Sequence, residues 1–125
     1  MKNLVTLRFM LVSLFAIMSM AVSADIIYSI DDGFRYKFDT EAKTAELAKY
    51  NGSATAVISE SVTYEGVVYS VTSLGEDCFY GCSSLTSINI PSSVTSLGEY
   101  CFYSCSSLTS INIPSSVTSL GEKCF

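Results

Sequence analysis

Five cysteines are the residues of this 125-residue chain best suited to carry chemistry. Cys78, Cys101 and Cys124 recur every 23 residues, and Cys82 and Cys105 form a second series with the same spacing. A Cys-x-x-x-Cys pair suggests zinc, but a structural zinc site needs a second pair facing the first, and here the second pair lies one repeat away. Two other interpretations stay open: buried thiols that pack as small hydrophobic groups, and disulfides between neighbouring repeats.

A series of carboxylates, Glu76, Glu99 and Glu122, follows a glycine in each repeat. Calcium takes about six to eight oxygen ligands, so one carboxylate per repeat makes a poor cage. We therefore expect solvated charges at these positions, and we expect neither a metal site nor a cofactor.

Catalytic machinery is not evident in the sequence. The chain contains no histidine for general-base chemistry, no glycine-rich phosphate loop and no nucleophile elbow, and its serines lack a recognisable activator. A net charge of -5 disfavours binding to nucleic acid. These features exclude the common enzyme classes and favour a non-enzymatic protein.

A tandem repeat positions all of these residues. Residues 71–93 recur almost unchanged as residues 94–116, and a partial third copy covers residues 117–125. The period of 23 falls in the range of about 20 to 29 that is typical of leucine-rich solenoids. The two complete copies differ at only two positions, where Asp77 and Gly81 become Tyr100 and Ser104.

Each repeat is expected to contain a short strand and a short helical segment. Ile88 and Ile90 alternate around Asn89, which predicts a strand from residue 87 to residue 90 with both isoleucines in the core. Pro91 ends the strand because it has no N–H to donate. The segment after Gly98 predicts one helical or 3₁₀ turn with Phe102 pointing inward, and successive repeats then stack strand on strand.

The outward side of these strands is the candidate binding surface. If the isoleucines point inward, a flat ladder of uncharged polar side chains points outward, and solenoids use such faces for extended recognition. The alternative is that these side chains only keep the sheet soluble. We call this surface the strand face, and its residues are Thr86, Ser87, Asn89, Thr109, Ser110 and Asn112.

The N-terminus predicts export. Lys2 and Arg8 precede an apolar run over residues 9–22, and small residues follow. This pattern is typical of a secretory signal peptide covering residues 1–24, and the run is too short to span a bilayer. We expect no membrane span after its removal, and a protein that is secreted or held at the cell surface.

Residues 25–70 predict a small β-rich lead-in or cap. Aromatic residues alternate with charged ones over residues 34–38, and residues 57–62 and 67–71 flank a turn with Gly66, which indicates a hairpin. Residues 40–50 remain ambiguous: their propensities favour a helix, but their position between strands favours another strand.

The repeat phrase Val-Thr-Ser-Leu-Gly-Glu-x-Cys-Phe-Tyr-x-Cys-Ser-Ser-Leu-Thr-Ser-Ile-Asn-Ile-Pro closely resembles the BspA-like leucine-rich repeat. The resemblance covers residues 71–125, and residues 61–70 look like the strands that often precede such arrays. It implies a bacterial surface or secreted protein that adheres to host matrix proteins or to other cells. It also implies a β-rich lead-in and so favours a strand at residues 44–49. The chain departs from the family where Cys78, Cys101 and Cys124 replace a more usual alanine.

Together these features predict an exported, non-enzymatic binding module built as a β-rich solenoid. The alternative is a rigid structural spacer that presents a further domain. Because the third copy stops at Phe125 with apolar residues uncovered, we expect either further repeats or self-association through the last repeat.

Overall fold

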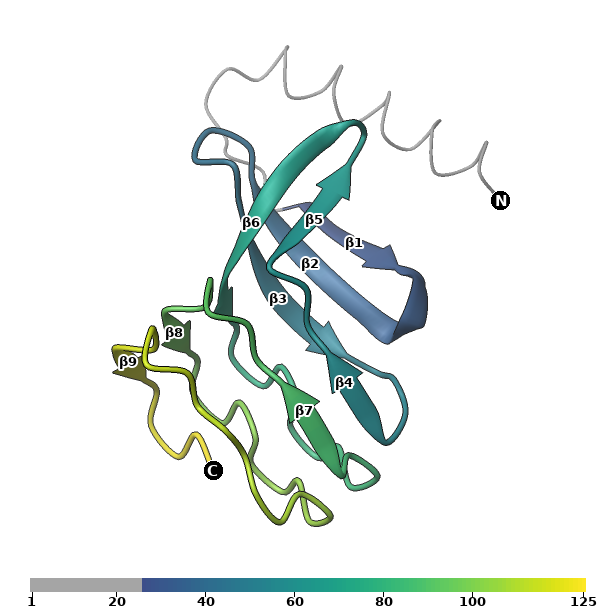
Figure 1. Cartoon of the computed structure of the whole chain (residues 1–125). Coiled ribbons are helices and arrows are strands. Elements are labelled where there is room, and N and C mark those ends of the chain that lie inside the picture. The colour runs from purple at the N-terminus through teal and green to yellow at the C-terminus, as the bar shows by residue number, and fades with distance from the viewer. Residues whose placement is uncertain (1–25) are drawn as a thin grey trace.

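The computed structural model describes residues 26–125. The signal peptide expected at residues 1–24 lies outside the described residues. Figure 1 shows long strands in the N-terminal half, followed by a coil of loops that carries short strands. No helix between residues 26 and 125 has the length and hydrophobicity that crossing a membrane requires.

Three antiparallel strands open the described chain: β1 (Ile26–Ile30), β2 (Phe34–Asp39) and β3 (Thr44–Tyr50). The alternation expected around residues 34–38 is confirmed, because Tyr36 and Phe38 are buried while Arg35 is exposed. A 3₁₀ turn, η1 (Asp31–Gly33), joins β1 to β2.

The open question of helix or strand before residue 50 is settled by β3. Ala45 and Leu47 are buried with a period of two, so the strand pattern prevails over the helix propensity of the same residues. The turn before β3 is closed by the carboxylate of Asp39, which accepts hydrogen bonds from the N–H groups of Glu41 and Ala42 at 2.9 and 2.8 Å.

The hairpin expected around Gly66 is confirmed, with one change of boundary. Strand β5 (Ser61–Tyr64) pairs antiparallel with β6 (Val67–Leu74). Glu65 and Gly66 both have positive φ, 49° and 76°, which a two-residue turn of the right-handed hairpin twist requires. The first arm starts at Ser61 because the preceding residues form a separate strand.

A parallel ladder continues from the lead-in into the repeats. Strand β3 pairs with β6, then β6 with β8 (Ser96–Leu97), and β8 with β9 (Ser119–Leu120). The same backbone hydrogen bond recurs at each step: the N–H groups of Gly75, Gly98 and Gly121 donate to the leucine carbonyl of the preceding layer at 2.8–2.9 Å. The matched leucines are Leu47, Leu74, Leu97 and Leu120.

A second wall consists of β4 (Thr55–Val57) and β7 (Ser87–Asn89), which pair in parallel. Strand β7 is the strand expected in the first repeat, and Ile90 is buried at its end. Residues 44–58 thus supply both walls of one layer beneath the first repeat. We call this layer zero.

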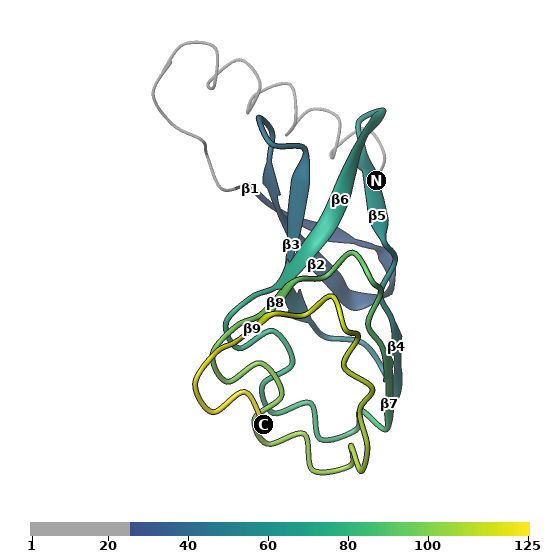
Figure 2. The same ribbon diagram turned by 60° about the vertical axis from the view of Figure 1, so that its left-hand side comes forward.

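Turns form the third wall, which Figure 2 shows at the bottom of the coil, seen nearly along its axis. The helical or 3₁₀ turn expected after the glycine is not confirmed, because residues 75–82 and 98–105 form consecutive turns. The positive φ of Asp77 (55°) and Tyr100 (51°) interrupts any helix. The N–H groups of Asp77, Phe79 and Gly81 instead donate to carbonyls of the next layer at 2.8–3.0 Å.

A column of aromatic rings fills the centre of the coil. The ring of Tyr50 in layer zero lies 5.1 Å from that of Phe79, which lies 5.1 Å from Phe102, and Phe102 lies 5.7 Å from Phe125. Phe79 and Phe102 are 0 % and 3 % exposed. Since Phe102 packs between its own duplicates, Phe79 and Phe125, identical repeats fit together without clash, and the predicted β-rich solenoid is confirmed.

Candidate functional site

The first half of the strand face lies where the sequence predicts it. Thr86, Ser87 and Asn89 are exposed on or beside β7, while Ile88 between them is half-buried. The backbone N–H and the hydroxyl of Thr86 both donate to the carbonyl of Ala54, at 2.8 and 3.1 Å. The strand is therefore anchored to layer zero and its outward side chains are held in a defined order.

The second half of the strand face is exposed but does not form the expected strand. Thr109, Ser110 and Asn112 lie in a segment without strand structure. Among residues 26–125, no backbone hydrogen bond joins this segment to β7. A strand needs a hydrogen-bonded neighbour to be held straight, so the predicted ladder from Ser87 to Ser110 is not formed here.

Layer zero extends the strand face in the other direction, which the sequence does not reveal. Thr55 pairs with Ser87, and Val57 pairs with Asn89, so their side chains lie on the same outward face. Val57 is 61 % exposed, an unusual position for a valine in a strand. The observed face therefore combines hydroxyls, an amide and an apolar side chain.

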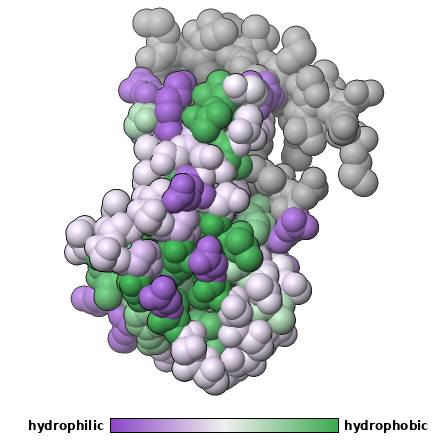
Figure 3. Space-filling view, viewed as in Figure 1, coloured by the Kyte–Doolittle hydropathy of each residue, from purple (hydrophilic) through white to green (hydrophobic). Residues whose placement is uncertain are grey.

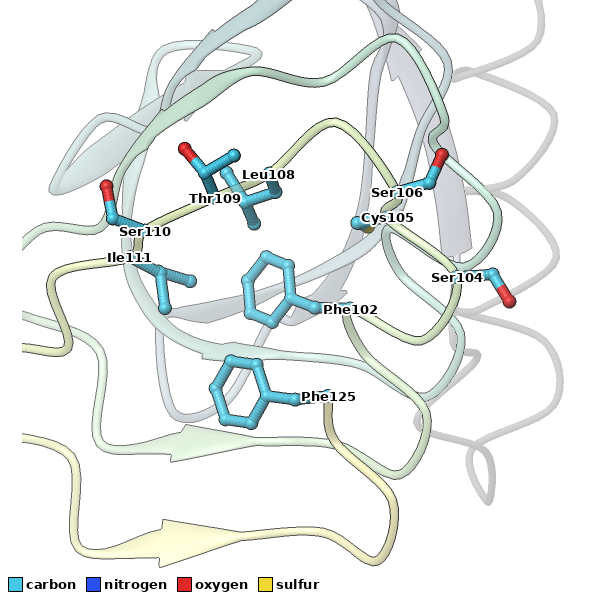
Figure 4. A pocket seen from close by; sticks show the side chains of 9 residues that line it. All are labelled: Phe102, Ser104, Cys105, Ser106, Leu108, Thr109, Ser110, Ile111 and Phe125. Atoms are coloured by element: carbon cyan, nitrogen blue, oxygen red, sulfur yellow. The ribbon is translucent and has the colours of Figure 1, made fainter.

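A cavity of about 300 Å³ opens beside the second half of the strand face. Figure 4 shows the stacked rings of Phe102 and Phe125, with Leu108 and Ile111 beside them. Thr109 and Ser110 line the same cavity. Figure 3 shows hydrophobic surface, coloured green, over this lower part of the molecule. The cavity is the interior of the last layer seen from its open side, so its apolar lining residues, Phe102, Leu108, Ile111 and Phe125, belong to the core pattern.

The cysteines lie in two columns along the turn wall. Cys78, Cys101 and Cys124 are buried, and Cys82 and Cys105 are half-buried. All five are free thiols. The thiol of Cys105 donates to the carbonyl of Phe79 at 3.1 Å. Their positions match small hydrophobic groups that pack between layers.

Burial makes Cys78 and Cys124 poor nucleophiles and lowers the reactivity of Cys82 and Cys105 less. It raises the pKa of Cys124 to about 11, raises the pKa of Cys78 well above its ordinary value, and also raises the pKa of Cys82 and Cys105. A protonated thiol attacks neither a disulfide nor an electrophile efficiently.

We expect no more than two thiols, Cys82 and Cys105, to react quickly with a disulfide reagent in the native chain at pH 8. The buried three should react at least about tenfold more slowly, because reagent reaches them only when layers open. Unfolding in guanidinium without reductant should release all five. Fewer than five would restore the disulfide interpretation, and five fast thiols in the native chain would contradict the buried columns.

Carboxylates and metal ligands do not gather in the described part of the chain. Glu76, Glu99 and Glu122 are exposed, one in each layer, as expected for solvated charges. Between residues 26 and 125 no three histidine, cysteine, aspartate or glutamate side chains form a group able to hold a metal ion.

Comparison with known proteins identifies a matching family and several solved structures with a similar fold. A family model described as the BspA type leucine-rich repeat region matches residues 58–125, with six copies. No curated protein matches the sequence.

Solved bacterial structures resemble most of the chain. A leucine-rich cell surface protein from Faecalibacterium prausnitzii is 25 % identical, with a TM-score of 0.59 over 82 % of this chain and 34 % of its own. A leucine-rich repeat protein from Bacteroides capillosus is 26 % identical, with a TM-score of 0.57 over 75 % of this chain and 86 % of its own. A leucine-rich repeat protein from Bacteroides ovatus is 28 % identical, with a TM-score of 0.55 over 75 % of this chain and 31 % of its own. The chain thus spans about a third of the length of the Faecalibacterium protein.

Proposed function

The chain belongs to the BspA-type leucine-rich repeat family, and from this premise we propose that it is an exported, non-enzymatic module that binds other proteins through its strand face. The observation that carries the proposal is the exposed row on β4 and β7. Thr55, Val57, Ser87 and Asn89 are presented side by side by two hydrogen-bonded strands.

This row suits recognition of a protein surface. It carries no charge, so a partner does not have to desolvate an ionised group to approach it. Val57 supplies apolar area that is 61 % exposed, and the hydroxyls and the amide of Asn89 supply donors and acceptors. Ser110 and Asn112 would join the row if a partner straightened their segment.

Export to the cell surface is supported by two observations. The sequence carries Lys2, Arg8 and the apolar run of residues 9–22, which is typical of a signal peptide over residues 1–24. The similar Faecalibacterium protein is described as a cell surface protein. Host matrix proteins and surface proteins of other cells are the partners that we propose.

We further propose that residues 25–70 cap the array and that residues 71–125 form its repeats. Layer zero supports this division. One edge of β3 pairs with β6 and β4 pairs with β7, whereas β2 covers the other edge of β3. Strand β6 spans the boundary at residue 70, so the cap and the repeats belong to one sheet. The lack of histidine and the repetition of every layer support a function without catalysis.

The double substitution Asn89→Glu and Asn112→Glu tests the strand face. We expect binding to a panel of immobilised extracellular matrix proteins, measured by surface plasmon resonance, to weaken at least about tenfold, because two charges would have to be buried without partners.

The matched control is Thr95→Glu with Thr118→Glu. These side chains are also exposed and one repeat apart, but they lie beside β8 and β9 on another wall. If binding to a panel member weakens equally in both double variants, or weakens in neither, the strand face is not the binding surface.

A rigid spacer is the second candidate function, favoured by the unbroken ladder from β3 to β9. Self-association is a further candidate, since Leu120 and Phe125 of the last layer are each 56 % exposed. A spacer would leave both double variants without effect on adhesion. Self-association would raise the mass measured by light scattering with concentration, and Leu120→Glu would abolish that rise.

A further inference from the structure

Three tyrosines, two of them exposed and one half-buried, form a strip on the turn wall, away from the strand face. The rings of Tyr80 and Tyr103 stack across neighbouring layers at 5.7 Å and 17°, and Tyr100 meets Tyr103 edge-on at 5.6 Å. Tyr80 is 47 % exposed and Tyr103 is 40 % exposed. We call Tyr80, Tyr100 and Tyr103 the tyrosine strip.

The core does not require these rings. The preceding residues, Phe79 and Phe102, already fill the interior and are almost completely buried. The exposed rings therefore cover little of the core and leave apolar faces in contact with water, where a binding partner gains from covering them.

The strip is also where the near-identical repeats differ. Ten of the 23 residues in the first repeat are exposed, and polar ones such as Ser83, Thr86 and Ser87 are unchanged in the second. Both differences fall on the turn wall, within three residues of a strip tyrosine. They are Asp77 against Tyr100 and Gly81 against Ser104, and the third copy has Lys123 at the first of these positions.

The variable position holds a strained backbone. Asp77, Tyr100 and Lys123 have φ values of 55°, 51° and 48°, in the left-handed region that glycine and asparagine occupy at least cost. A tyrosine and a lysine at this position lower stability relative to those residues, so the backbone conformation does not explain these two side chains.

The side chain of Lys123 places a cation over one ring of the strip. The ammonium of Lys123 lies 5.7 Å from the centre of the Tyr100 ring, within the range of a cation–π contact. Tyr80 and Tyr103 have no such cation among the contacts of the described residues. The exposed carboxylates of Glu76 and Glu99 lie in the same layers as these two rings, in a chain of net charge -5.

We propose that the tyrosine strip binds a segment of a partner protein that carries arginine or lysine side chains. The cations lie over the faces of Tyr80 and Tyr103, as Lys123 lies over Tyr100, and the carboxylates of the same layers attract them. This site shares no residue with the strand face, so the two proposals are tested by different substitutions.

A fluorescein-labelled peptide of six arginines tests the site by fluorescence anisotropy with the full chain. We expect saturable binding, and about tenfold weaker binding to the double variant Tyr80→Ser and Tyr103→Ser, because two cation–π contacts are lost while the net charge is unchanged. Val68→Ser, which removes an apolar side chain that is 58 % exposed on the β5–β6 hairpin, should bind as the unchanged protein does.

A peptide in which neutral citrulline replaces every arginine should not bind, since its planar side chains carry no charge. Far-UV circular dichroism must show that the tyrosine variant is folded, and Tyr80→Phe with Tyr103→Phe should restore binding because the rings return. Binding that stays within twofold in the folded serine variant but falls in Glu76→Gln with Glu99→Gln would overturn the proposal, because charge alone would then explain it.

Discussion

Replacing Phe79 by alanine is expected to lower the free energy of unfolding by about 3–5 kcal/mol. The ring is fully buried and stacks between Tyr50 of layer zero and Phe102 of the next repeat. Its removal leaves a cavity that the neighbouring layers cannot fill, because each is fixed by backbone hydrogen bonds. A domain of this size is stable by only about 5–15 kcal/mol, so urea denaturation should show a large loss.

Phe125→Ala is the matched control. Phe125 belongs to the same column and stacks on Phe102, but it is 56 % exposed. We expect a loss of about 1 kcal/mol or less, since much of its surface stays in water in the folded state. Equal losses in the free energy of unfolding for the two variants would contradict a column whose rings are fully buried near layer zero and partly exposed in the last repeat.

Gly98→Ala is expected to cost about 1–3 kcal/mol, or more if the layers must separate. A methyl group at this position would lie 2.5 Å from the backbone N of Glu76 and 2.6 Å from the backbone carbon of Gly75. These atoms belong to the layer below and cannot move without breaking the repeated hydrogen bond between layers.

Gly75→Ala isolates this clash. The three atoms nearest to the same methyl group at Gly75 would all belong to the side chain of Glu46, with its Oε1 atom at 2.9 Å, and that flexible carboxylate can turn away. We expect a change within about 0.5 kcal/mol in thermal or urea denaturation. If Gly75→Ala were as damaging as Gly98→Ala, the close approach of Gly98 to the layer below would not explain the loss.

The sequence predicted the repeated features of the fold because the repeats are nearly identical. The inward direction of Ile90, Leu97 and Phe102 followed from spacing alone and is confirmed by their burial. The hairpin at Gly66 followed from turn chemistry. Local patterns of this kind are strong when each layer repeats the same contacts.

Layer zero was not predicted, because its spacing differs from the period. Leu47 precedes its partner Leu74 by 27 residues, and Ala56 precedes its partner Ile88 by 32. A self-comparison at a fixed interval of 23 finds neither pair. The exposed Val57, which belongs to the candidate site, was missed for the same reason.

The helical or 3₁₀ turn expected on the turn wall is not confirmed, and the backbone of this wall explains why. A Cys-x-x-x-Cys spacing fits a helical turn, but Tyr100 and Ser104 adopt positive φ, which propensity does not anticipate for a tyrosine. The tyrosine strip lies on this wall. The stacking of Tyr80 on Tyr103 across layers belongs to these turns and not to a helix.

Both proposed surfaces depend on one continuous stack of layers that begins in the lead-in, and amide hydrogen exchange measured by NMR tests this most directly. The N–H of Gly75 donates to Leu47 at 2.9 Å, and the N–H of Gly98 donates to Leu74 at 2.8 Å. We predict exchange rates for Gly75 and Gly98 that are within about tenfold of each other and far below those of an unfolded chain. A protected Gly98 beside a Gly75 that exchanges at the unfolded rate would show that the stack starts at the first repeat, and would contradict a stack that begins in the lead-in.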